Sequence, residues 1–146
     1  MPVRKAEAEW RGDLKRGEGK LWLGRGVPLG DYSAASRFEA GKGGNPEELI
    51  GAAHAGCFSM ALAGILAEAG HTPQRIHTTA AVHLEKEGDR FSITRIDLHT
   101  EVAVPGMSDQ EFQEKALQAK VDCPVSRALA ATAITLEAKL VPGEGG

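Results

Sequence analysis

Positive charge is not in excess in this chain, which argues against functions that depend on a basic surface. The 146 residues include 17 Lys and Arg against 20 Asp and Glu, a formal net charge of −3. This balance provides no excess of positive charge with which to bind nucleic acid or an anionic membrane. We therefore expect no nucleic-acid partner and no membrane partner.

The start of the sequence lacks an apolar run, and cysteine is scarce. Residues 1–5 read Met-Pro-Val-Arg-Lys and lead into further charged residues, so we expect no secretory signal. The expected compartment is then the cytoplasm, where thiols stay reduced. The two cysteines of the chain are accordingly either inert core residues or a redox pair.

Several catalytic motifs are missing as well. The glycine-rich run at residues 41–44 has neither the G-x-G-x-x-G nor the P-loop spacing, and no G-x-S-x-G nucleophile elbow occurs. We find no internal repeat and no interdomain linker. With 42% hydrophobic and 25% charged residues, the composition is that of a globular protein, and we expect one domain over residues 1–146.

A long apolar helix is the element around which the chain is organised. Asn45 is a suitable N-cap, Pro46 fits the first helical position, and Glu48 can complete a capping box. The segment then stays small or apolar until Gly70, a natural stop. Because glycines and His54 interrupt it and acids begin it, we interpret it as a core helix and not as a membrane span.

The remaining segments predict an α+β fold with an antiparallel sheet. A second helix should begin after Ser108 in a capping box, and a short third helix should open at Cys123-Pro124 with Asp122 as its N-cap. Residues 24–30 are expected to form a loop. Alternating apolar positions predict strands over Val3–Trp10, Ile76–Lys86 and Phe91–Val104. We also expect a hairpin partner of the first strand over Leu14–Leu23 and further strands over Tyr32–Phe38 and Thr132–Val141.

Both cysteines occupy special places on the expected helices. Cys57 is surrounded by small residues on its helix face, and Cys123 lies at a helix N-terminus, where unpaired N–H groups favour a thiolate. Both could equally be small core hydrophobes. His54 shares a face with Cys57 and could form a metal site with the two cysteines, although a structural zinc site would want a fourth ligand. Arg37, taken alone, is only a surface arginine on a strand.

Two segments in combination make the chain recognisable. It resembles the OsmC/Ohr family of thiol-dependent peroxidases, named for osmotic induction and organic hydroperoxide resistance. The sequence of these segments is closer to the OsmC branch of the family, since the Ohr branch usually has Tyr in place of Val125. The resemblance covers nearly the whole chain and depends on Asn45-Pro46-Glu47-Glu48-Leu49-Ile50-Gly51-Ala52-Ala53-His54-Ala55-Gly56-Cys57-Phe58-Ser59-Met60-Ala61-Leu62 and on Asp122-Cys123-Pro124-Val125-Ser126-Arg127-Ala128-Leu129.

The resemblance implies a set of site residues. Cys57 would be the peroxidatic cysteine and Cys123 the resolving cysteine. Arg37 would stabilise the Cys57 thiolate, and Glu47 would orient that arginine. The fold would be an intertwined homodimer in which antiparallel sheets enclose two long central helices.

The implied reaction reduces organic hydroperoxides, and hydrogen peroxide less well, to alcohols in oxidative and osmotic stress defence. It passes through a Cys57 sulfenate and a Cys57–Cys123 disulfide. An external dithiol reduces the pair, and a lipoyl group or lipoylated protein is one donor of that kind. No metal, haem or flavin is required. We expect an apolar substrate pocket from residues of the long helix, namely Phe58, Met60, Leu62 and Ile65.

Helix geometry adds a prediction of its own. Glu47 and Cys57 are ten positions apart, which is roughly 15 Å along one helix at about 1.5 Å per residue. Glu47 therefore cannot readily serve the Cys57 of its own chain. Two such helices crossing antiparallel would bring Glu47 of one chain toward Cys57 of the other, so we predict an active site shared across a two-fold interface.

Other functions remain open from the sequence alone. The cysteines could belong to a non-enzymatic redox sensor or binding module, to a metal-binding protein that uses His54, or to a structural stress protein. The roles of Ser126 and Arg127 are also open.

Overall fold

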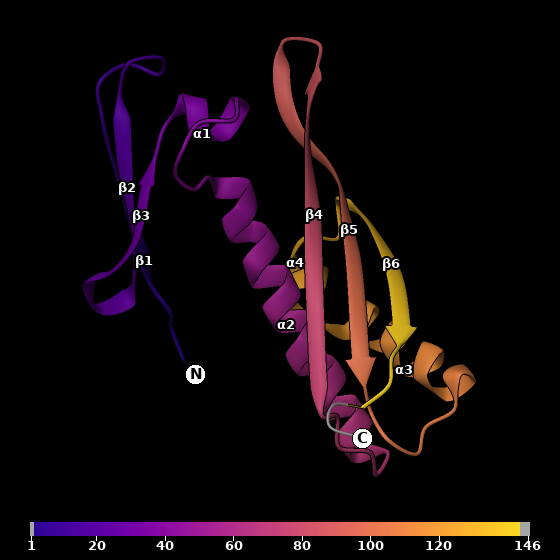
Figure 1. The fold of residues 1–146 in the computed structure, drawn as a ribbon. Helices are drawn as coiled ribbons and strands as arrows, with labels where there is room; N and C mark the ends of the chain where they lie inside the picture. The colour runs from indigo at the N-terminus through magenta and orange to yellow at the C-terminus, as the bar shows by residue number, and fades with distance from the viewer. Residues whose placement is uncertain (1, 144–146) are drawn as a thin grey trace. The chain divides into compact units, whose positions relative to one another are not determined.

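The computed structural model describes residues 2–143, which form two compact units, one up to Leu49 and one from Ile50 onward. The expectation of a single domain stays a prediction. Figure 1 shows the elements in chain order. They are β1 (Ala6–Arg11), β2 (Glu18–Leu23), a 3-10 turn (Gly24–Gly26), β3 (Val27–Tyr32), α1 (Ala34–Phe38), α2 (Pro46–Glu68), β4 (Arg75–Glu87), β5 (Arg90–Ala103), α3 (Asp109–Asp122), α4 (Pro124–Ala128) and β6 (Ala133–Leu140).

The first unit is an antiparallel sheet in the order β1-β2-β3, followed by the short helix α1. Two expectations for this unit are wrong. Residues 27–30, expected in a loop, belong instead to strand β3, because an edge strand accommodates Pro28, which has no N–H to donate. The expected strand over Tyr32–Phe38 is instead mostly helix α1, and Arg37 lies on that helix and not on a strand.

A capping box explains why α1 is helical. The Ser33 hydroxyl accepts a hydrogen bond from the Ser36 backbone N–H at 3.1 Å, and the Ser33 N–H donates to the Ser36 hydroxyl at 2.8 Å. These two bonds satisfy backbone donors that a first helical turn otherwise leaves unpaired. The hydrogen bonds of the two serines favour a helix here, although the surrounding residues show a weak strand pattern.

The long helix α2 begins and ends as its sequence predicts. The Asn45 side chain accepts a hydrogen bond from the Glu48 backbone N–H at 2.8 Å, which confirms Asn45 as the N-cap. The chain leaves the helix at Gly70, whose φ of +86° is a left-handed conformation that glycine adopts freely. By length and composition α2 also meets the criteria for a membrane span, with a mean hydropathy of 1.7. A core helix meets the same criteria, and we retain that interpretation.

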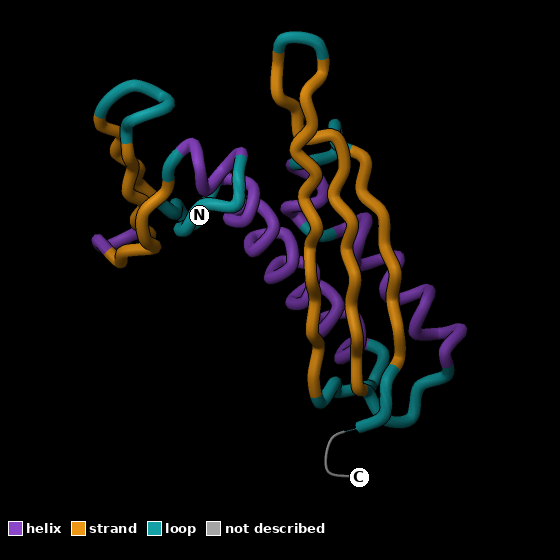
Figure 2. Tube along the Cα trace, turned by 45° about the horizontal axis from the view of Figure 1, so that its top comes forward, coloured by secondary structure: helices purple, strands orange, loops and turns teal. Residues whose placement is uncertain are grey.

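The second unit is a three-stranded sheet, β4-β5-β6, with helices packed on one face (Figures 1 and 2). Along β5 the alternate residues facing the helices are buried, namely Ile96, Leu98, Thr100 and Val102. They pack in one core with Phe58, Leu62 and Leu66 of α2 and with Phe112, Ala116 and Ala119 of α3. The α+β class and the alternating strand patterns are therefore confirmed.

One strand pairing differs from the expected antiparallel sheet. β4 and β5 are antiparallel, but β5 and β6 are parallel. The chain leaves β5, forms α3 and α4, and returns to the sheet edge in the same direction, as a crossover connection requires. This crossover carries Cys123 into the core, where it lies between α3 and α4.

Candidate active site

The two cysteines, 66 positions apart in the sequence, meet within the second unit. Both are free thiols, Cys57 half-buried and Cys123 fully buried, and their side chains are hydrogen-bonded to each other. Cys57 is held by α2, and Cys123 by the junction that ends α3 and caps α4. The structure therefore brings together the two residues expected to form the redox pair.

The junction at Cys123 corrects one local expectation. Asp122 is the last residue of α3, and Cys123 itself is the N-cap of α4, without a side-chain capping bond. The backbone N–H of Val125, in the first turn of α4, donates its hydrogen bond to the sulfur of Cys57. The first turn of α4 thus acts on Cys57 as well, across the contact between the two segments.

The environment of Cys57 leaves the sulfur without a cation. Burial is the main cause that raises the pKa of Cys57, and the hydrogen bond between the Cys57 thiol and Cys123 raises it further. The Val125 amide lowers the pKa, but less than burial raises it. No positively charged group among residues 2–143 contributes. The chain alone therefore favours the thiol, whereas nucleophilic attack requires the thiolate.

Arg37 and Glu47 form an ion pair within the first unit. The Arg37 Nε and Nη2 atoms both donate to Oε1 of Glu47, at 3.0 and 2.8 Å. The Glu47 side chain is 9% exposed and that of Arg37 is 37% exposed, so the carboxylate is buried while the guanidinium reaches the surface. The predicted pairing of Arg37 with Glu47 is present, between residues of the same chain.

The segment between the two charged residues is held by hydrogen bonds. The Ser36 hydroxyl donates to the Gly44 carbonyl at 2.7 Å, and the Asn45 amide donates to the Ser36 carbonyl at 3.1 Å. Gly43 lies at a φ of +108° with the Asp31 carbonyl oxygen 2.7 Å from where a Cβ would stand, so this turn requires glycine. These contacts fix the end of α1 against the start of α2, and with them the position of the guanidinium.

Glu47 has one acceptor left over. Its Oε2 atom is buried, and none of the described residues donates a hydrogen bond to it. A buried carboxylate oxygen without a donor is unfavourable, and native structures rarely contain one. Oε2 is therefore available to accept a hydrogen bond from a group outside the described residues.

An apolar pocket of about 280 Å³ adjoins Arg37 in the first unit. It is lined by Trp10, Leu14, Tyr32, Ser33, Ala34, Arg37 and Phe38. The residues expected to form such a pocket do not line it, because Phe58 and Leu62 are fully buried in the core and Met60 is 78% exposed. The expected pocket on the long helix stays a prediction.

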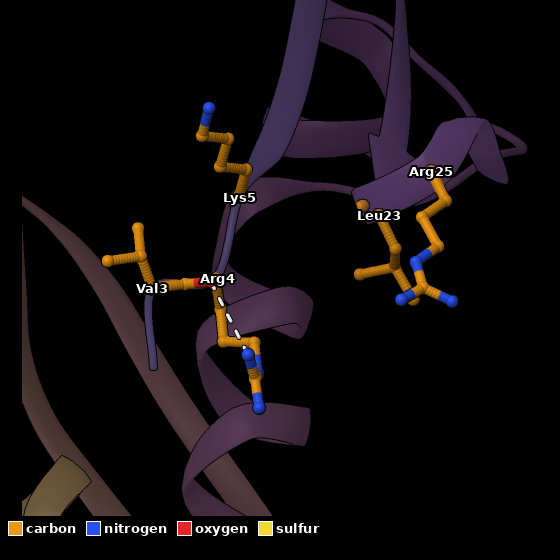
Figure 3. A pocket seen from close by; sticks show the side chains of 6 residues that line it. Val3, Arg4, Lys5, Leu23 and Arg25 are labelled. Atoms are coloured by element: carbon orange, nitrogen blue, oxygen red, sulfur yellow. Dashed lines mark hydrogen bonds between the residues drawn. The ribbon is translucent and has the colours of Figure 1, made fainter. Parts of the chain in front are cut away.

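A second pocket in this unit has a different character. Arg4, Lys5 and Arg25 lie around it with Val3, Leu23 and Gly24 (Figure 3). The charged ends of Lys5 and Arg25 point in different directions, and the Arg4 guanidinium donates to the Val3 carbonyl at 3.4 Å. The cations do not converge on one point, so we do not regard this pocket as a ligand site.

His54 and Ser126 form a buried polar pair that the sequence does not predict. His54 Nε2 and Ser126 Oγ are 2.7 Å apart, His54 is 0% exposed and Ser126 is 5% exposed. Burial lowers the pKa of His54, so the imidazole is neutral at pH 7. Across residues 2–143 no three His, Cys, Asp or Glu side chains converge as metal ligands would, and the suggested site of His54, Cys57 and Cys123 is not formed.

Comparison with known proteins agrees with this arrangement. The model of the family described as OsmC-like protein matches residues 39–139. The chain belongs to this family. It is 51% identical over 138 residues to the protein named peroxiredoxin OsmC of Escherichia coli, covering 94% of this chain and 96% of that protein, and it matches the Shigella flexneri protein of the same name equally well.

Solved structures support membership of the OsmC-like family at the level of the fold. An OsmC-like protein of unknown function from Vibrio cholerae superposes with a TM-score of 0.76 at 18% identity, covering 94% of this chain and 99% of that one. The organic hydroperoxide resistance protein OhrB of Bacillus subtilis superposes with a TM-score of 0.67 at 24% identity, covering 94% and 98%. The α+β architecture of the chain is thus that of OsmC and Ohr proteins.

Proposed function

We propose that the protein is a thiol-dependent peroxidase that reduces organic hydroperoxides to alcohols, in defence against oxidative and osmotic stress. The observation that carries the proposal is the pair of reduced sulfurs in hydrogen-bond contact, Cys57 half-buried and Cys123 fully buried. Two relatives that are 51% identical to this chain are named peroxiredoxin OsmC, and a structural neighbour is named an organic hydroperoxide resistance protein.

The proposed reaction balances with two sulfurs and an external dithiol. The Cys57 thiolate attacks one peroxide oxygen, an S–O bond forms as the O–O bond breaks, and the departing alkoxide takes up a proton to give the alcohol. The Cys123 thiol then displaces the hydroxyl group of the Cys57 sulfenic acid, and this releases water and forms the disulfide. A dithiol returns two electrons and two protons and is itself oxidised to a disulfide.

The dithiol comes from outside the chain. We propose a small dithiol or a lipoylated protein as this reductant, because a neighbouring second thiol lets the donor leave as a closed disulfide. A cytoplasmic location fits such a donor, since the cytoplasm keeps dithiols reduced.

The thiolate needs a positive charge that the chain itself does not supply to Cys57. We propose that Arg37 of a second copy provides it in a homodimer. A guanidinium stays charged when buried, and its fork is held here by Glu47. Since Arg37 and Glu47 pair within one chain, they would enter the partner's site together. The buried Oε2 atom of Glu47, to which none of residues 2–143 donates, would gain a donor there.

One face of α2 supports dimerisation. The exposed residues of α2 between Glu48 and Glu68 are apolar and almost all small: Ala52, Ala53, Gly56, Met60, Gly64 and Ala67. A Cβ at Gly56 or Gly64 would meet nothing within 4 Å, so no crowding within the chain explains these glycines. Glycine inside a helix is destabilising by roughly 0.5–1 kcal/mol relative to alanine. Close approach of a second α2 would account for them, in line with the shared site predicted from helical rise.

The apolar pocket beside Arg37 suggests where the organic part of the peroxide binds. Trp10, Tyr32 and Phe38 provide aromatic surface, and the guanidinium lies at the same wall. An alkyl or aryl group in this pocket would place the polar peroxide near the cation. Hydrogen peroxide has no such group, so we propose that it is the poorer substrate.

Peroxide consumption by cysteine variants tests the proposal. With a dithiol present, the wild-type protein should turn over cumene hydroperoxide faster than hydrogen peroxide. Cys57→Ser should abolish turnover, whereas Cys123→Ser should consume about one equivalent and stop. Full turnover by Cys57→Ser would refute the proposed roles. A redox sensor with the same cysteines would form the disulfide but would not sustain turnover with added dithiol.

A further inference from the structure

The buried pair of His54 and Ser126 lies one helical turn from the two cysteines on both chain segments that carry them. His54 precedes Cys57 by three positions on α2, and Ser126 follows Cys123 by three positions at α4. Residues three apart share a helix face. The bond between His54 and Ser126 is therefore a second connection between the same two segments, beside the contact between the sulfurs.

Helix α4 depends on such connections for its position. It has only five residues, far fewer than a helix needs to be stable by itself. Its N-cap residue, Cys123, makes no side-chain capping bond. Val125 and Leu129 pack against the core, but apolar packing is not directional. A 2.7 Å hydrogen bond between two buried side chains fixes the distance and orientation of α4 relative to α2.

Two groups that act on Cys57 lie in this positioned segment. The Val125 N–H donates to the Cys57 sulfur, and the Cys123 side chain is hydrogen-bonded to it. Both contacts depend on the same placement of the first turn of α4. A hydrogen bond to sulfur weakens steeply with distance and angle, and disulfide formation requires the two sulfurs to close to about 2.05 Å.

We propose that His54 and Ser126 are positioning residues for the thiol chemistry, and that their hydrogen bond holds α4 against α2 so that the Val125 amide and the Cys123 sulfur stay at Cys57. The consequence for turnover rests on the proposed function. The consequence for the equilibrium between dithiol and disulfide does not, because that equilibrium depends only on how closely the two sulfurs are held.

Loss of the bond changes three measurable quantities. If α4 is held less closely, the effective concentration of one sulfur at the other falls by about tenfold, which makes the disulfide ~30 mV easier to reduce. In a Cys123→Ser background, where the opposing contact with the Cys123 thiol is absent, the Cys57 thiolate loses its amide donor and its pKa rises. The sulfenic acid also persists longer before Cys123 reacts with it, so more of it proceeds to sulfinic acid.

Ser126→Ala is the direct test, with Ser126→Thr as the conservative variant that keeps the hydroxyl. The disulfide equilibrium is measured in dithiothreitol redox buffers, the Cys57 pKa by thiolate absorbance in a Cys123→Ser background, and the sulfinic product by intact mass after peroxide treatment. We expect Ser126→Ala to shift all three quantities and Ser126→Thr to restore them at least in part.

Ser59→Ala is the matched control. Ser59 lies on the same helix two positions after Cys57, but its hydroxyl bonds Thr78 of β4 at 2.8 Å and has no partner on α4. Its loss removes a hydrogen bond of the same kind from α2 without releasing α4. We expect it to lower the unfolding temperature while leaving the disulfide equilibrium and the Cys57 pKa unchanged.

A double variant, His54→Leu with Ser126→Ala, keeps the test decisive if the single variant folds poorly. Replacing both polar partners by apolar groups leaves no buried polar atom unpaired, so most of the stability should return. We expect the shifted disulfide equilibrium to remain in the double variant. The proposal would be overturned if the disulfide equilibrium of the double variant returned to the wild-type value together with its stability. It would also be overturned if Ser126→Ala left the disulfide equilibrium unchanged, or if Ser59→Ala shifted it equally.

Discussion

Replacing Gly64 by leucine distinguishes the geometry of a single chain from that of the proposed dimer. Gly64 lies on the exposed face of α2, and a Cβ there would meet nothing within 4 Å. In a single chain the substitution should therefore stabilise the helix by up to ~1 kcal/mol, since leucine is a far better helix former than glycine. For a chain of this size, ~1 kcal/mol corresponds to about 2–4 °C in unfolding temperature.

In a dimer with crossing α2 helices the same substitution should lower stability instead of raising it. The leucine side chain would occupy the space into which the partner helix packs, and forced overpacking typically costs about 1–3 kcal/mol. We expect Gly64→Leu to weaken the dimer in sedimentation equilibrium, to lower the unfolding temperature and to reduce peroxide turnover. Gly64 is seven positions from Cys57, or roughly 10 Å along the helix, so the loss would not arise from direct contact with the cysteine.

Gln118→Leu on α3 serves as the control, because it places the same side chain on an exposed helical position away from α2. It should leave dimerisation and turnover unchanged. A Gly64→Leu protein that unfolds at a higher temperature, with wild-type assembly and wild-type turnover, would refute the proposed role of this face.

Two further predictions concern charged groups. Hydrogen bonds from Thr135, His83 and Arg95 hold the pKa of Asp97 at about 2, below its value in the unfolded chain. The stability that this carboxylate contributes is therefore present above about pH 4 and is lost as pH falls toward 2. Between pH 4 and pH 2 the unfolding temperature should fall less in Asp97→Asn than in wild type. Arg37→Lys should lower kcat/KM for peroxide by about tenfold or more, because an ammonium group cannot keep both hydrogen bonds to Glu47 and reach the thiolate as well. An Arg37→Lys protein with wild-type kcat/KM would show that only the positive charge matters.

The parts of the fold that the sequence predicts are those with local signals. The N-cap at Asn45, the stop at Gly70 and the alternating pattern of β4 and β5 are each encoded within a few residues. The parallel pairing of β5 with β6 is not encoded locally, because it depends on how α3 and α4 lead the chain back to the sheet. Helix α1 was missed since two serines forming a capping box outweigh a strand-like composition.

Some residues of the candidate site are likewise predicted from the sequence, and others are not. Cys57, Cys123, Arg37 and Glu47 were selected by resemblance to a family, and their contacts within one chain are consistent with that selection. The pair of His54 and Ser126 was missed, because the two residues are 72 positions apart and each has ordinary structural roles. The matched spacing of three positions from each cysteine is the signal that could have indicated it. The sequence does not predict the pocket beside Arg37 either, since its lining comes from β1, the turn after β1, β3 and α1.

Subunit exchange between two inactive variants tests the shared site most directly. Cys57→Ser and Arg37→Ala homodimers should each be nearly inactive. A mixed dimer would contain one complete site, formed by Arg37 and Glu47 of the Cys57→Ser chain with Cys57 and Cys123 of the other. If each site spans two chains, random exchange of equal amounts should restore about one quarter of wild-type peroxide turnover per subunit. If each site lies within one chain, the mixture should stay as inactive as its parents.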